Sequence, residues 1–177
     1  GDFNVSCNGA NDGAISVSIE GGTPDCTTFA PECYDYDWTS CDPVNIPGVS
    51  QQNDLPAGSY CVVVTDINGC VATTEIDLEE PEPIESSGAV SDYNGFEISC
   101  TGACDGWISP NITGGNGNYV LYQWISGDIG DNEATADTLF NLCPGSYELR
   151  VVDQQDCENI ILFELEEPEE LDLTVDS

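Results

Sequence analysis

The sequence predicts an all-β protein of two tandem, disulfide-bonded, antiparallel β-sandwich modules. Three observations predict this fold class. One sequence pattern occurs twice, apolar and polar residues alternate within short runs, and the 177 residues include ten cysteines. No segment has the periodicity of a helix.

The internal repeat determines the predicted domain organisation. Its period is about 87 residues, the spacing from Asp66 to Asp153. We expect a first repeat at 1–83, a second at 84–170, and at 171–177 the leading strand of a further repeat, as in a window from a longer array. The matching segments are VSCNG (5–9) with ISCTG (98–102), DGAIS (12–16) with DGWIS (105–109), GG (21–22) with GG (114–115), LPAGSY (55–60) with LCPGSY (142–147), and LEEPE (78–82) with LEEPE (165–169).

Two-residue alternation predicts the strands. Apolar side chains or threonine occupy every second position in residues 15–19, 60–64 and 74–78, and acidic residues fill the other face of the last run. This period is typical of strands with one buried face. Glycine-containing turns separate the runs at the spacing of a small sandwich. Trp38 and Trp124 occupy matching positions, and we expect both in the core.

The charge balance excludes several partners and reactions. The chain has 34 acidic residues against one basic residue, Arg150, for a formal net charge of -33, and it has no His. We expect no nucleic-acid partner, because nothing neutralises phosphates. No apolar run is long enough for direct membrane insertion. Without His or Lys the usual nucleophile–base pairs cannot form, so we expect no enzyme and no catalytic residue.

The ten cysteines predict disulfides, and therefore secretion into an oxidising extracellular compartment. Positions shared by the repeats predict the bridges Cys7–Cys70 and Cys100–Cys157. Two cysteines that occur only in the second repeat predict Cys104–Cys143. Among the four that remain in the first repeat the pairing stays open, and we favour Cys26–Cys33 with Cys41–Cys61.

The combined pattern resembles the SprB-type repeat. It consists of C-x-G-x-x-D-G-x-I, then G-G, a Trp strand, L-x-x-G-S-Y, D-x-x-x-C and E-P, and both copies contain it. That family occurs in the cell-surface and gliding adhesins of Bacteroidetes-type bacteria. The resemblance implies Ig-like β-sandwich modules, export to the cell surface, and a role in adhesion or gliding.

Calcium is the cofactor that the acidic residues suggest, because Ca²⁺ binds carboxylate and carbonyl oxygens on irregular backbone. The alternative is turn chemistry, since Asp before Gly stabilises turns. We favour turn chemistry for the two Asp-Gly positions, and for the Glu-Glu-Pro-Glu links the two alternatives are balanced. The candidate ligands are Asp12, Asp66, Asp105, Asp153, Glu80 and Glu167.

Two functions follow as expectations. The first is a structural stalk or spacer segment of a surface adhesin or extracellular filament, whose partners are neighbouring copies of the same repeat. The second is a module that binds surface glycans or a protein through its loops or Trp107, with calcium-stiffened junctions. Asp137-Thr138-Leu139 resembles a bacterial O-glycosylation signal, which makes Thr138 a candidate glycosylation site.

Overall fold

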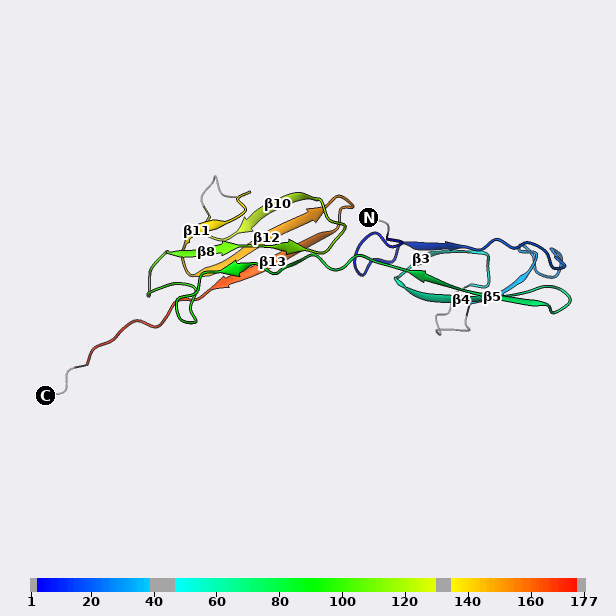
Figure 1. Ribbon diagram of the computed structural model, residues 1–177, viewed down its shortest axis with the longest axis horizontal. Helices are drawn as coiled ribbons and strands as arrows, with labels where there is room; N and C mark the ends of the chain where they lie inside the picture. The colour runs from blue at the N-terminus through cyan, green and yellow to red at the C-terminus, as the bar shows by residue number, and fades with distance from the viewer. Residues whose placement is uncertain (1–2, 39–46, 130–134, 175–177) are drawn as a thin grey trace. The chain divides into compact units, whose positions relative to one another are not determined.

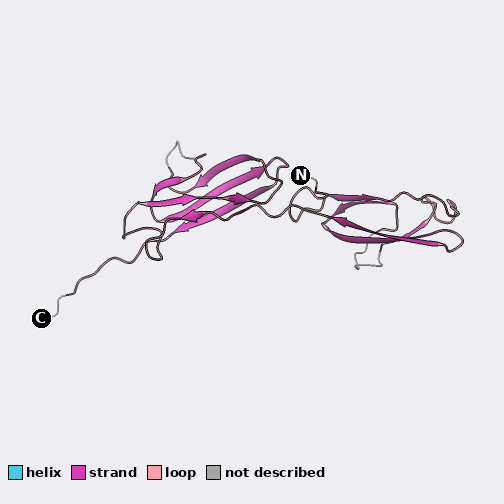
Figure 2. Cartoon of the chain, in the orientation of Figure 1, coloured by secondary structure: helices cyan, strands magenta, loops and turns pink. Residues whose placement is uncertain are grey.

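The computed structural model describes residues 3–38, 47–129 and 135–174, and within these ranges the regular elements are all strands (Figures 1 and 2). Every strand pair described is antiparallel. The predicted all-β fold class is therefore confirmed, while the Ig-like description stays a prediction. The chain divides into two compact units, Gly1–Pro81 (unit 1) and Glu82–Ser177 (unit 2).

Unit 1 contains a two-stranded and a three-stranded sheet. Strands β1 and β3 pair in the first sheet, and β4 lies between β2 and β5 in the second. The strands are β1 (Gly13–Ser16), β2 (Asp35–Asp37), β3 (Gln51–Leu55), β4 (Gly58–Thr65) and β5 (Val71–Leu78).

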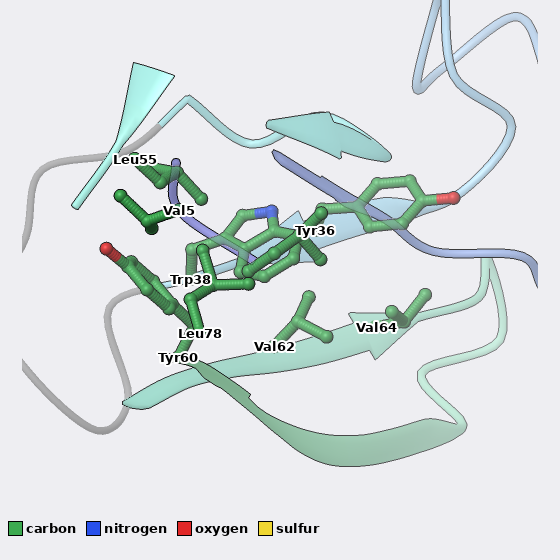
Figure 3. Close-up of a cluster of buried hydrophobic side chains, with 9 residues drawn as sticks. Val5, Tyr36, Trp38, Leu55, Tyr60, Val62, Val64 and Leu78 are labelled. Atoms are coloured by element: carbon green, nitrogen blue, oxygen red, sulfur yellow. The ribbon is translucent and has the colours of Figure 1, made fainter. Parts of the chain in front are cut away.

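The core of unit 1 lies between these two sheets (Figure 3). Trp38 is buried there, as expected, and its indole Nε1 donates a hydrogen bond to the Val49 carbonyl at 3.0 Å. The alternation predicted for β4 places Tyr60, Val62 and Val64 in this core. The other buried members are Val5, Ile15, Tyr36, Leu55 and Leu78.

Unit 2 repeats this arrangement with additional short strands. Strand β12 is central between β10 and β13, β8 is central between β7 and β11, and β6 pairs with β9. Trp124 is buried, and its Nε1 donates to the Ala136 carbonyl at 3.0 Å. The strands are β6 (Glu85–Ser86), β7 (Ala89–Val90), β8 (Gly106–Ser109), β9 (Ile112–Thr113), β10 (Tyr119–Ser126), β11 (Leu139–Leu142), β12 (Gly145–Asp153) and β13 (Glu158–Leu165).

The Asp-Gly motif at the start of β1 and β8 has a packing reason. A Cβ on Gly106 would lie 2.7 Å from Ile98 Cδ1 and 2.9 Å from Leu165 Cδ1. Gly13 is enclosed in the same way, with Leu78 Cδ1 at 2.8 Å. The glycine therefore lets the first strand approach the end of the last strand more closely than any side chain allows.

Two of the predicted disulfides are present, Cys26–Cys33 and Cys104–Cys143. Cys61 is also disulfide-bonded. The bridge predicted for it involves Cys41, which lies outside the described residues.

The bridges Cys7–Cys70 and Cys100–Cys157 were wrong, because Cys70 and Cys100 are free thiols. Cys70 directly precedes β5, whereas the loop that follows Cys7 contacts Glu80, just beyond the other end of that strand. An eight-residue strand spans about 25 Å, far beyond the roughly 7 Å that a disulfide tolerates between Cα atoms. Strand β13 separates Cys100 from Cys157 in the same way.

Candidate functional site

The residues shared by the two repeats gather at opposite ends of each unit. We call the end where the last strand passes into the Glu-Glu-Pro-Glu segment the link end. The opposite end, where a tight turn precedes that strand, is the turn end. Glu80 and Glu167 lie at link ends, and Asp66 and Asp153 lie at turn ends.

Each link end is closed by the second glutamate of its Glu-Glu-Pro-Glu segment. Glu80 Oε2 accepts a hydrogen bond from the Gly9 N–H at 2.6 Å, and Glu167 Oε2 accepts one from the Gly102 N–H at the same distance. In unit 1 the Asn8 side chain also donates to Glu80 Oε1 at 3.1 Å. The predicted calcium ligands Glu80 and Glu167 therefore fasten the cysteine loop to the end of the last strand.

Asp12 and Asp105 stabilise the same loops from their other side. Asp12 Oδ1 accepts from the Ser6 N–H at 3.0 Å, and Asp105 accepts from both the N–H and the hydroxyl of Ser99. Hydrogen bonding from Ser6 and Ser99 lowers the pKa of each carboxyl below its ordinary value. These contacts are the turn chemistry that the Asp-Gly motif predicted.

Asp66 and Asp153 organise the turn ends. Asp66 accepts backbone hydrogen bonds from Cys70 at 2.8 Å, Asn68 at 2.9 Å and Thr23 at 3.0 Å. The bonds from Cys70 and Thr23, in that order, lower the pKa of Asp66 and outweigh the opposing effect of burial. The carboxylate therefore ties the β4–β5 turn to residue 23, which follows the Gly-Gly pair.

Asp153 makes an equivalent but denser set of contacts in unit 2. Burial would raise its pKa, but hydrogen bonds from Asn116, Gln155 and Cys157 together lower it. Both carboxylate oxygens accept two bonds each: Oδ1 from the N–H groups of Gln155 and Cys157, Oδ2 from the N–H and side-chain amide of Asn116. A carboxylate has about four lone-pair positions, so Asp153 has no spare position for a cation.

Within the described parts of the chain, no group of three or more His, Cys, Asp or Glu residues is placed to hold a metal ion. The structure brings the link glutamates and the Asp-Gly carboxylates to the same loop, but each is engaged by N–H donors. Calcium binding stays a prediction. To bind the ion, these carboxylates would have to give up the hydrogen bonds that they accept from N–H groups.

Sequence reasoning did not identify a groove at the turn end of unit 1, with a volume of about 410 Å³. The segment 17–22 forms one wall, and the first half of β5 forms the other. Thr74 lines the groove, which explains why it is exposed although the alternation placed it inward. Ile76, also expected to point inward, is half-buried against the core. The remaining lining residues are Tyr34, Val62, Val64, Asp66 and Cys70.

Two further candidates lie on the surface of unit 2. Trp107 is half-buried and pairs across β8 and β11 with Phe140, whose side chain is exposed. Thr138, the candidate glycosylation site, is half-buried, and its hydroxyl is 3.1 Å from the Ser109 hydroxyl. Glycosylation there stays a prediction.

Comparisons with known proteins support the resemblance that the sequence motifs indicate. No curated protein matches the chain. Among the described residues, no helix has the length and apolarity that crossing a bilayer requires. Residues 4–42 match the family model of the SprB repeat. This stretch contains the cysteine loop, the Asp-Gly strand and the Gly-Gly turn of the first repeat, so the predicted resemblance to the SprB-type repeat is confirmed.

Proposed function

We propose that the chain is a structural stalk or spacer segment of a secreted cell-surface adhesin or extracellular filament. The observation that carries this proposal is the identical closure of the link end in both repeats. In each, the residues that precede the cysteine loop bond to the first glutamate of the link: the Val5 N–H donates to the Glu79 carbonyl, and the Ile98 N–H to the Glu166 carbonyl, both at 3.1 Å.

Such a closure suits a load-bearing repeat. Force that enters through the link meets the last strand, which is bonded along its whole length to β4 in unit 1 and to β12 in unit 2. The disulfides add covalent reinforcement inside each repeat. The SprB-type repeat and the cysteine usage support an extracellular location.

The proposal predicts that length grows with repeat number. Chains that carry one, two and three copies of this sequence joined end to end should increase in maximum dimension by a constant step. Each copy contains two repeats, and each repeat should add at least about 30 Å, the length of a nine-residue strand. Small-angle scattering measures this increment, and a dimension that grows only as the cube root of mass would refute a stalk.

A binding module is the second candidate, favoured by the aromatic pair Trp107 and Phe140. Flat aromatic faces stack on sugar rings, and Phe140 is exposed beside Trp107 on neighbouring strands. Phe140→Ala should abolish binding to any glycan that the chain recognises on an array, whereas Val120→Ala, at an even more exposed position, should not. A chain that binds no glycan would leave only the stalk.

A further inference from the structure

A short strand that precedes the second cysteine loop closes the turn end of unit 2. Ile84 is 5% exposed, and β6 pairs with β9 so that Glu85 lies opposite Thr113. The Gly115 N–H donates to the Glu82 carbonyl, and the Asn159 side chain donates to the Ile84 carbonyl, both at 2.7 Å. Residues 82–86 thus form part of the fold of unit 2.

The corresponding place in unit 1 is the groove. Matching Gly21-Gly22 with Gly114-Gly115 puts residues 19–20 in the position of β9, and these two residues line the groove without forming a strand. A Cβ on Gly114 would overlap the main chain of Pro83, whereas a Cβ on Gly21 would meet nothing within 4 Å. The space that the leading segment fills in unit 2 is open in unit 1.

The chain carries a second leading segment, after β13. Its residues follow Leu-Glu-Glu-Pro-Glu as residues 83–86 do, so that Leu171 matches Ile84 and Leu173 matches Ser86. Leu171 and Leu173 are 87% and 84% exposed, and this segment leaves β13 in extended form (Figure 1). Within the part of the chain that the structure describes, both leucine side chains are left open to solvent.

We propose that residues 170–174 of one copy of this chain bind in the unit 1 groove of a second copy, as an added strand beside residues 19–20. We further propose that docking joins Cys100 of the first copy to Cys70 of the second in a disulfide. This is strand addition to an open sheet edge, in which backbone bonds provide affinity and the leucines provide specificity. The inference extends the proposed stalk function by naming how successive copies connect.

The two free thiols support this docking independently. Cys70 lines the groove and is exposed, and Cys100 is exposed in the loop whose Thr101 hydroxyl bonds to the Pro168 carbonyl at 2.8 Å. Pro168 is three residues before Leu171, a span of about 10 Å in extended chain. A leucine seated in the groove therefore brings the loop of Cys100 to the turn of Cys70.

The cysteines at the two matching positions are not free thiols. Cys7 corresponds to Cys100, Cys157 corresponds to Cys70, and both Cys7 and Cys157 are disulfide-bonded. The reaction is thiol–disulfide exchange: the two thiols lose two protons and two electrons to a low-molecular-weight disulfide such as oxidised glutathione, which leaves as two thiols. One sulfur–sulfur bond forms in the protein and one breaks in the oxidant.

The test mixes two single variants, each able to make only one half of the junction. Cys70→Ser retains the tail and Cys100, and Cys100→Ser retains the groove and Cys70. Each is held at about 1 mM, the effective concentration that a short linker imposes, in a glutathione redox buffer with at least about 0.15 M salt to screen the acidic surfaces. Non-reducing electrophoresis measures the dimer, and peptide mass spectrometry identifies the linked cysteines.

The mixture should form a Cys100–Cys70 dimer, each variant alone should stay monomeric, and the unsubstituted chain should form a ladder. Leu171→Asp with Leu173→Asp in the Cys70→Ser copy should lower the dimer yield at least about tenfold, since two apolar side chains lose their burial. The control is Leu162→Asp, an exposed leucine on β13, which should leave the yield unchanged.

Three results would overturn the proposal: no dimer, dimers of each variant alone in equal yield, or a yield indifferent to the tail substitutions. None of these results bears on whether length grows with repeat number. The scattering experiment therefore tests the stalk function separately from this junction.

Discussion

Removal of the Cys104–Cys143 disulfide should destabilise unit 2 by about 4 kcal/mol. The two cysteines are 39 residues apart, and closing a loop of that length removes about 13 cal/mol/K from the entropy of the unfolded chain. Cys104 is exposed and Cys143 half-buried, so replacing both with Ser sacrifices little packing. Almost the whole effect should therefore come from the unfolded state.

The Cys26–Cys33 bridge provides the matched comparison. Its cysteines are only 7 residues apart, for which the same relation gives about 2.4 kcal/mol. Replacement of this pair with Ser should therefore cost unit 1 less than the other replacement costs unit 2. The difference, about 1.5 kcal/mol, is more than a tenfold change in the unfolding equilibrium.

Native-state hydrogen exchange resolves the two units separately. The slowest amides of β12 report the free energy of unfolding of unit 2, and those of β4 report that of unit 1. A loss below about 1 kcal/mol in β12, or a larger loss from the short loop than from the long one, would refute the loop-entropy reasoning.

Five further predictions concern charge, packing and cations. Because the pKa of Asp153 is lowered on folding, its contribution to stability is complete above about pH 4 and is lost as pH falls through the lowered value; a melting-temperature difference from Asp153→Asn that stays constant on acidification would contradict this. Asp153→Asn should cost about 1–3 kcal/mol in urea unfolding at pH 7, because an amide cannot accept all four hydrogen bonds, and the deficit should shrink in acid. Gly106→Ala should cost about 1–3 kcal/mol by overpacking against Ile98, and a neutral result would show that the strand can shift. Arg150→Gln should change stability by less than about 1 kcal/mol, since its ion pair with Glu158 is exposed. Millimolar Ca²⁺ should raise the melting temperature relative to chelator if the link glutamates bind it, and identical curves would exclude such a site.

The alternation of β4 correctly predicted its core side chains, because Tyr60, Val62 and Val64 on its inner face are all buried. Strand β5 has the same pattern, yet only Leu78 is buried. The reason is that no strand covers its first half, and a local pattern cannot say whether a partner is present. Periodicity therefore predicts which face is apolar, not how much of that face is covered.

The cysteines likewise show which contacts a local sequence pattern can predict and which depend on the tertiary fold. Cys104 and Cys143 occur only in the second repeat, and this joint gain identified their bridge. Cys7 and Cys70 occur at positions shared by both repeats, but equivalence does not reveal that a full strand length separates them. The hydrogen bond from the Gly9 N–H to Glu80 places the cysteine loop at the link end. No sequence motif predicts this contact.

The position of the single basic residue has a consequence for resistance to proteolysis. Proteases of the trypsin class cleave only after Lys or Arg, and this chain offers them one peptide bond, Arg150–Val151. That bond lies inside β12, with hydrogen-bonded neighbours on both sides in β10 and β13. A protease must draw its substrate into an extended strand of its own, which β12 can supply only after the whole three-stranded sheet separates. The folded chain therefore presents no accessible cleavage site to proteases of the trypsin class.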